Sequence, residues 1–406
     1  MKVLHNPITL AHRAHEVVGA RMIEAYECPE RITSILTALE PVYDISHVET
    51  DVVRATAAAE KIHSPAYLRH LESIFAAWVA KGMVKSDGCL LPECFPVTRL
   101  GPGGHGRARE PKDLAARVGF YAFDMSTGIS RDTYPSAIAS ADLARRGAEE
   151  LVGAAARVAH GASDAAPVVF SMCRPPGHHC QSDLMGGYCY LNNTAIAVRT
   201  LLDSIPSPAD QVSILDLDFH HGNGTQSIFY SQSNPCYVSI HGEDEYPYFT
   251  GAPEETGEGE GEGYNLNLPL PCEGSTFENY RPRLEEALEK IVSVGTKWLV
   301  ISLGFDTFVG DPVGKFQLTR QDYGTIGAMV GALKVPTLVV LEGGYVVEEL
   351  GRNCLSFLRG LEQGRRADAK VCVEVEEVSS SEDEGSSGEE SEGWEEVRVV
   401  GDEAGR

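Results

Sequence analysis

The stretch VSILDLDFHHGNG (residues 212–224) runs from a short apolar segment directly into polar residues. An apolar segment of this length, rich in β-branched residues, is typical of a strand buried on both faces of a parallel sheet. Alternate side chains of a strand share a face, so we expect Asp216, Asp218 and His220 to point to the same side. Burying two carboxylates together without a cation is very costly. The stretch therefore predicts a buried strand with a metal ion at its end.

Comparable apolar segments recur from residue 168 onward: VVFSMC (168–173), CYVSI (236–240), WLVISLGF (298–305) and TLVVLEGG (337–344). They alternate with stretches of helical apolar spacing: LNNTAIAVRTLL (191–202), FENYRPRLEEALEKIV (277–292) and LTRQDYGTIGAMVGAL (318–333). This alternation predicts an α/β fold, in which one large domain has a central parallel sheet with helices on both faces. The first 165 residues are interpreted as mainly helical, with a loop-rich stretch at 86–133.

Chemically active side chains follow four of the predicted strands. In chain order, His178 and His179 come after the first strand (168–173), and Asp218 and His220 lie at the end of the second (212–219). Asp306 follows the fourth (298–305), and Tyr345 follows the fifth (337–344). Ligands of open α/β sheets bind outside the carboxyl ends of the strands, so we expect these side chains to meet. A single buried histidine or aspartate is more often a structural group, but their joint placement at strand ends indicates a catalytic site.

The predicted metal ligands are Asp218, His220 and Asp306. Two carboxylates and one imidazole leave a coordination position for water, as catalytic zinc sites do. This open three-ligand set makes Zn²⁺ the preferred ion. Because the ligands are rich in oxygen, Fe²⁺ remains an alternative.

Five motifs, in a fixed order, make the sequence resemble a known family. They are RPPGHH (174–179), GGYCYLNN (186–193), DLDFHHGNGTQ (216–226), SLGFDT (302–307) and LEGGY (341–345). The chain resembles the zinc-dependent deacetylases of the arginase/deacetylase superfamily, which include histone deacetylases and acetylpolyamine amidohydrolases. The resemblance extends over roughly residues 1–362, and it implies the arginase/deacetylase fold and a hydrolase that cleaves linear amides.

The resemblance also implies a role for each site residue. His178 and His179 form a proton-transfer pair in which His179 is the expected base, although the sequence does not decide between them, and Tyr345 donates a hydrogen bond to the oxyanion. Asp216 and Asn223 would hold the two histidines, and a structural K⁺ would lie below the zinc. The positions implied for substrate contact are Asp124, Gly187, Tyr188 and Phe249.

The identity of the substrate is predicted only by local features. The segment from Arg99 to Arg117 is rich in Lys and Arg, and Ala115, Ser126 and Val313 supply no acid near the expected entrance. These features favour acetyl-lysine in histones or other proteins, which would connect the enzyme with chromatin regulation. An acetylated polyamine is the alternative, and an inactive acyl-lysine-binding scaffold is a third interpretation. The stretch 86–133 is interpreted either as a homodimer contact or as a free surface loop.

Charge and hydropathy limit the function classes further. The 34 Lys and Arg against 59 Asp and Glu give a formal net charge of −25, which argues against direct nucleic-acid binding. No apolar run approaches the ~20 residues that span a bilayer, and the first residues do not form a signal peptide. We therefore expect an intracellular protein, cytoplasmic or nuclear, with no membrane contact.

The predicted domain boundary lies near residue 365. Residues 1–365 form the predicted catalytic domain, and residues 366–406 a disordered tail of acids, serines and glycines. Such a composition cannot bury enough apolar surface to fold alone. The tail is interpreted either as a solubilising segment or as a site for a basic partner.

Overall fold

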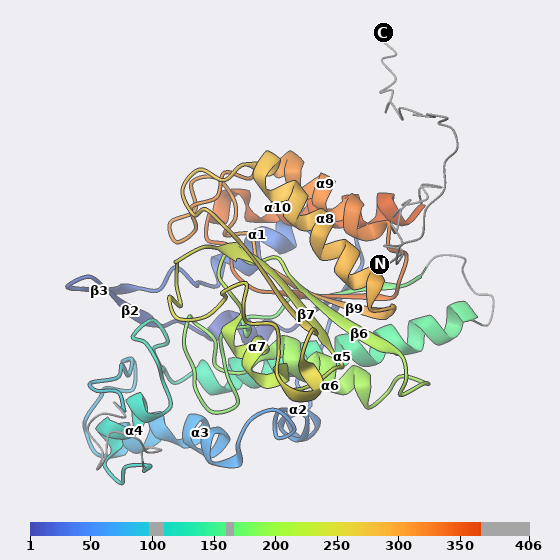
Figure 1. Ribbon diagram of the computed structural model, residues 1–406. Helices are drawn as coiled ribbons and strands as arrows, with labels where there is room; N and C mark the ends of the chain where they lie inside the picture. Colours follow the sequence, from blue (N-terminus) through green and yellow to red (C-terminus); the bar gives the residue numbers. More distant parts are fainter. Residues whose placement is uncertain (97–108, 160–165, 367–406) are drawn as a thin grey trace, which may run out of the picture. The chain divides into compact units, whose positions relative to one another are not determined.

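The computed structural model describes residues 1–96, 109–159 and 166–366, and a central sheet of eight parallel strands organises this part of the chain (Figure 1). The strands lie in the order β4-β1-β5-β10-β9-β6-β7-β8. Their bounds are β1 Lys2–His5, β4 Ile45–His47, β5 Val168–Ser171, β6 Gln211–Asp216, β7 Cys236–Gly242, β8 Asn265–Leu270, β9 Thr296–Leu303 and β10 Thr337–Leu341. The predicted α/β fold with a parallel sheet is confirmed.

Helices cover both faces of this sheet, as predicted (Figure 1). One layer contains α1 (Glu30–Leu39), α8 (Phe277–Ser293), α9 (Arg320–Gly331) and α10 (Val347–Arg366). The opposite layer contains α5 (Thr133–Ala159), α6 (Asn193–Leu202) and α7 (Asn223–Phe229). The other helices are α2 (Val52–Ala59), α3 (Pro65–Ala80), α4 (Leu114–Phe120) and the 3-10 helices η1 (Pro7–Ala11) and η4 (Gly259–Gly261).

The alternation of side chains along the strands explains the two layers. In β10, Val339 and Leu341 pack into the core beneath the layer of α8, α9 and α10. Leu338 and Val340 point the other way and pack with α5 and α6. Because both faces are covered, the central strands are apolar at most positions on both faces, which is the signal that the sequence carries.

The N-terminal part of the chain contains more strands than the sequence predicts. The interpretation of the first 165 residues as mainly helical is incomplete, because β1 and β4 join the central sheet and β2 (His15–Val18) pairs with β3 (Arg21–Glu24) as an antiparallel hairpin. Strand β8 at the sheet edge was also missed. The strands β1 to β4 have only three or four residues and show no clear periodicity, and the partners of β1 in the sheet, β4 and β5, are distant from it in sequence.

The topology brings the predicted site residues to one edge of the sheet. β5, β10, β9 and β6 are consecutive neighbours and all run in the same direction, so the loops that follow them meet. Asp216 is the last residue of β6, and the other site loops begin directly after β5, β9 and β10.

Two predictions about the whole chain have different outcomes. In the described residues no helix is both long enough and apolar enough to cross a membrane. Helix α10 ends at Arg366, so the first residue assigned to the acidic tail is helical. Residues 367–406 lie outside the described part, and the tail and its boundary stay predictions.

Candidate active site

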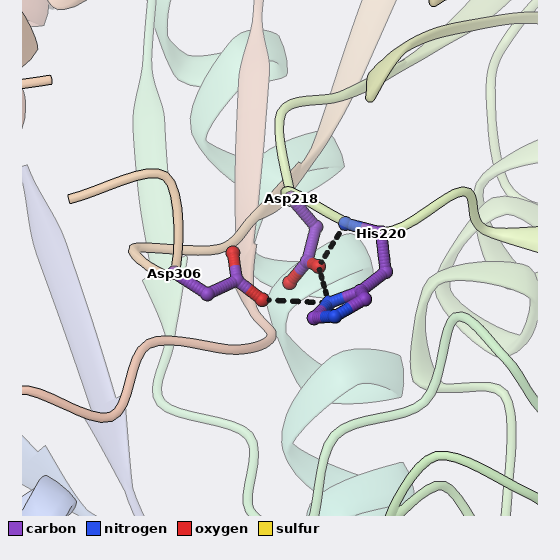
Figure 2. A group of neighbouring side chains, drawn as sticks. All are labelled: Asp218, His220 and Asp306. Carbon is purple, nitrogen blue, oxygen red and sulfur yellow. Dashed lines mark hydrogen bonds and ion pairs between the residues drawn. The ribbon is translucent and has the colours of Figure 1, made fainter. Parts of the chain in front are cut away.

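The three predicted metal ligands converge after β6 and β9 (Figure 2). One ligand atom from each of Asp218, His220 and Asp306 lies within 4.8 Å of the others, and all three residues are buried. His220 Nδ1 is 3.3 Å from Asp218 Oδ1 and 3.0 Å from Asp306 Oδ2. Burial and the nearby Asp218 carboxylate raise the pKa of Asp306 to about 7, because two buried carboxyl groups resist sharing negative charge. A bound cation would relieve this repulsion between the Asp218 and Asp306 carboxylates.

Backbone groups support the two carboxylates. The N–H of Gly343 donates to Asp218 Oδ2 at 2.8 Å, and the N–H of Phe219 donates to Asp306 Oδ1 at 2.8 Å. A Cβ at Gly304 would lie 2.1 Å from Asp218 Oδ2, and a Cβ at Gly343 would lie 2.4 Å from Asp306 Oδ2. Only glycine therefore fits at these two positions. Two fixed carboxylates with an imidazole form a donor set that suits zinc and similar divalent cations.

His178 and His179 lie beside this triad, with ring centres 4.1 Å apart. His178 Nδ1 is 3.1 Å from Asp216 Oδ2, and its Nε2 is 3.6 Å from Asp218 Oδ1. His179 Nδ1 is 2.8 Å from Asn223 Oδ1. Since an amide oxygen only accepts hydrogen bonds, Nδ1 of His179 carries the proton and Nε2 is left as a proton acceptor. The predicted pairing of Asp216 and Asn223 with the two histidines agrees with these contacts.

The two imidazoles have opposite pKa shifts. Burial lowers the pKa of His178, but the carboxylates of Asp218 and Asp216 outweigh burial and hold it well above the ordinary value. Burial, together with the rings of His178 and His220, holds the pKa of His179 well below the ordinary value. Environments that separate the pKa values of paired groups are typical of acid and base partners. This arrangement favours the protonated form of His178 and the neutral form of His179.

Tyr345 lies at the same site and is 9% exposed. Its ring centre is 4.9 Å from the guanidinium carbon of Arg31, and Arg31 Nε donates to the carbonyl of Gly344 at 2.7 Å. Arg31 is a residue that the sequence interpretation missed. In the sequence, the only signal for Arg31 is a charged residue at the start of the short amphipathic segment RITSILTAL (31–39). In the structure its side chain is completely buried.

A cavity of about 460 Å³ opens above these groups. It is lined by Glu16, Val17, Val18, Gly19, Asp124, Met125, Ser126, His179, Gly187, Tyr188, His220, Glu245, Tyr246, Tyr248, Val313 and Tyr345. The structure thus places three of the four expected substrate-contacting residues, Asp124, Gly187 and Tyr188, on the cavity wall. A Cβ at Gly187 would lie 2.2 Å from the ring of His179, so glycine is required for this close approach.

The fourth expected contact, Phe249, lies outside the wall of this cavity. Phe249 is 90% exposed and does not line the cavity, and the inward aromatic side chain is Tyr246 instead. The Tyr246 ring stands edge-on to that of His179, with centres 5.0 Å apart, and its hydroxyl donates to Asp124 Oδ2 at 2.6 Å. The segment YPYF offers three aromatic residues within four positions, and the sequence does not show which one the turn directs inward.

The charged lining of the cavity is acidic. Glu16 accepts hydrogen bonds from the Tyr188 hydroxyl at 2.9 and 3.0 Å, and Glu245 pairs with Lys315 at 2.5 Å. With Asp124, these give three carboxylates on the wall, whereas no Lys or Arg is among the lining residues of the described chain. Glu16 and Glu245 were not identified from the sequence, because they come from the missed hairpin and from the loop after β7.

Comparisons with known proteins agree with this geometry. Residues 25–361 match the model of the histone deacetylase domain. The chain is 39% identical to acetylpolyamine amidohydrolase 2 of Pseudomonas aeruginosa over 87% of this chain and 96% of that protein. It is 37% identical to acetylpolyamine amidohydrolase of Mycoplana ramosa over 85% of this chain and 95% of that protein.

One solved structure and a further relative show the same relationship. The crystal structure of an acetylpolyamine aminohydrolase from Burkholderia pseudomallei matches with a TM-score of 0.78 and 33% identity, covering 90% of this chain and 99% of that one. The yeast histone deacetylase HDA1 (Saccharomyces cerevisiae) is 36% identical, but only over 47% of this chain and 28% of its own length. The matched domain, the five ordered motifs and the converging site residues together show that the chain belongs to the histone deacetylase family, a group of zinc-dependent deacetylases with the arginase/deacetylase fold.

Proposed function

We propose that this protein is a deacetylase that hydrolyses the acetyl amide of a small cationic amine, such as an acetylated polyamine. The observation that carries the proposal is the acidic cavity, in which Glu16, Asp124 and Glu245 lie on the wall without an Arg or Lys among the lining residues of the described chain. A positively charged amine is favoured there over a neutral or anionic one. Two relatives that match 87% and 85% of this chain are named as acetylpolyamine amidohydrolases.

This proposal replaces acetyl-lysine, which the sequence favours. That preference depended on the basic segment from Arg99 to Arg117 and on missing acids at Ala115, Ser126 and Val313. Residues 97–108 of the segment lie outside the described residues, and Arg117 pairs with Glu110 at 3.5 Å. The acids of the cavity come from other loops. Chromatin regulation has no support in the comparisons, which favour the polyamine alternative.

Asp218, His220 and Asp306 would hold the divalent ion, with zinc as the preferred metal. Such an ion supplies Lewis-acid chemistry, polarising the amide carbonyl and lowering the pKa of a water molecule. Iron as a substitute and a structural K⁺ stay predictions.

The chain's own residues would move the protons. Nε2 of His179 is the free acceptor, because its Nδ1 is engaged with Asn223, so His179 would take the proton of the attacking water. The same proton would then pass to the leaving amine. His178, held between Asp216 and Asp218, would remain protonated and stabilise negative charge nearby.

Tyr345 would donate its phenolic hydrogen to the carbonyl oxygen as negative charge develops on it. Tyr188 and Tyr246 would flank the aliphatic stem of the substrate, since both line the cavity and are fixed by hydrogen bonds to Glu16 and Asp124. These bonds orient the aromatic walls before substrate binds.

The test is a steady-state assay of the purified protein with N-acetylputrescine and with an acetyl-lysine peptide, each with and without a metal chelator. The proposal expects acetate release from N-acetylputrescine at the higher kcat/KM, and loss of activity with the chelator that added zinc restores. A higher kcat/KM for the peptide would favour the acetyl-lysine alternative. Binding of the peptide without turnover of either substrate would favour an inactive scaffold.

We retain three predictions about the protein as a whole. A homodimer through residues 86–133, a cytoplasmic or nuclear location, and a basic partner for the acidic tail each need separate experiments, namely the solution mass, the cellular location and a pull-down with the tail peptide.

A further inference from the structure

A single buried carboxylate, that of Asp311, connects the cavity wall to Tyr345. Asp311 lies in the loop between β9 and α9 and is 7% exposed. Its Oδ2 accepts a hydrogen bond from the backbone N–H of Tyr345 at 2.7 Å. Its Oδ1 accepts hydrogen bonds from the N–H groups of Val313 at 3.0 Å and Gly314 at 3.1 Å. The carboxylate therefore joins the loops that follow two neighbouring strands, β9 and β10.

The loop that carries Asp311 is itself firmly placed. A Cβ at Gly314 would lie 1.7 Å from the backbone oxygen of Asp306, so this part of the loop rests directly on the backbone of a metal-ligand candidate. The N–H of Val309 also donates to the carbonyl of Leu318 at 2.9 Å, which closes the base of the loop. Asp311 is thus a fixed point against which another group can be positioned.

The Tyr345 segment, in contrast, needs such a fixed point. Tyr345 follows Gly343 and Gly344, and Gly344 has a φ of +112°, a conformation that other residues rarely adopt. Two glycines before a reacting side chain leave the backbone intrinsically free. Arg31 restrains the carbonyl of Gly344, and Asp311 restrains the N–H of Tyr345.

The cost of burying Asp311 indicates that its position matters. Within the described residues Asp311 forms no ion pair with Lys or Arg, and an isolated buried carboxylate is unfavourable. Three backbone donors offset this cost, two from its own loop and one from the Tyr345 loop. The donor from the Tyr345 loop is not needed to stabilise the loop of Asp311 itself. It indicates that the carboxylate also serves to hold Tyr345.

We infer that Asp311 is a positioning residue for Tyr345, an inference that rests on the proposed function. It holds the backbone of Tyr345 so that the phenol meets the carbonyl oxygen of the substrate. Val313 lines the cavity, and its N–H donates to the same carboxylate. Asp311 therefore fixes the position of the Val313 wall relative to the Tyr345 hydroxyl.

The test is a double-mutant cycle between Asp311→Asn and Tyr345→Phe, with kcat, KM and bound metal measured for each variant. An amide has a single acceptor oxygen, so Asn cannot serve both loops as the carboxylate does. In the wild-type background we expect Asp311→Asn to lower kcat by up to about a hundredfold, the cost of a misplaced group near the reaction, with a small change in KM and full metal content. In the Tyr345→Phe background we expect almost no further loss, because the positioned hydroxyl is already absent.

The control is Asp322→Asn, which removes a carboxylate that accepts from the N–H of Thr319 at the start of α9 but lies away from the cavity. It should leave kcat unchanged in both backgrounds. If Asp311→Asn fails to fold, Asp311→Glu, which moves the carboxylate by one methylene, replaces it in the cycle. Equal losses in the two backgrounds would overturn the inference alone, whereas a metal-loaded wild type without turnover would overturn the proposed function and this inference with it.

Discussion

The floor of the cavity and its rim are built in different ways. The floor consists of residues in the loops after β5, β6, β9 and β10, and each ligand or proton-transfer group there is held by hydrogen bonds with a neighbouring side chain or backbone amide. The rim comes from the β2–β3 hairpin and the loops around residues 124–126 and 245–248. A parallel sheet fixes the positions of its strand ends, whereas the conformation of each loop depends on its own sequence and contacts. The floor therefore specifies the chemistry, and the rim specifies the substrate.

The largest expected effect comes from removing a floor ligand. Asp218→Asn should abolish metal binding and reduce turnover to background, because the imidazole and the remaining carboxylate no longer form a complete set. Elemental analysis and the acetate-release assay measure both quantities. Full metal content with full activity in this variant would show that the triad is not the metal site and would break the distinction between floor and rim.

Tyr345→Phe should lower kcat by about 10² to 10³-fold, the usual cost of losing one donor to a developing oxyanion. Bound metal should not change, because Tyr345 is not one of the three clustered ligand candidates. Turnover equal to that of the wild type would remove the hydroxyl from the mechanism.

Asn223→Asp tests the electrostatics of the floor. Replacing the amide beside His179 Nδ1 by a carboxylate should raise the pKa of His179, because the negative charge favours the protonated imidazole. Because His179 acts in its neutral form, the acidic limb of the kcat/KM profile should move to higher pH by the same amount, and activity below that limb should fall. A profile identical to that of the wild type would mean that another group is the base.

The smallest effects are expected at the rim, where a matched aromatic pair sharpens the comparison. Tyr246→Ala should raise KM about tenfold, since it removes an aromatic wall worth ~1 to 2 kcal/mol, with bound metal unchanged. Phe249→Ala, three residues away but 90% exposed, should leave KM and kcat as they are. The reverse result would restore Phe249 as the wall residue.

The same contrast explains how much the sequence predicted. The apolar segments before Asp216 and Asp306 mark strands buried on both faces, and the rule that ligands gather at their carboxyl ends placed the triad, His178, His179 and Tyr345 at one site. The short strands β1 and β4 were missed because three or four residues carry little periodicity.

The rim was predicted less well, for physical reasons. Tyr246, rather than Phe249, faces the cavity because of turn geometry that three aromatic residues within four positions do not reveal. Glu16 reaches the cavity from a hairpin whose pairing is local but whose docking beside Met125 depends on tertiary contacts. The basic segment from Arg99 to Arg117 therefore did not reveal that the charged residues on the cavity wall are acidic.

The most direct test of the central claim, that the acidic cavity selects a cationic amine, compares two amides of equal length. N-Acetylputrescine carries an ammonium group at its far end, and N-pentylacetamide carries a methyl group there. With zinc-loaded protein we predict a kcat/KM at least about tenfold higher for N-acetylputrescine, and a difference that shrinks as salt screens the charges. Equal kcat/KM values at low salt, or a preference for the neutral amide, would contradict the account.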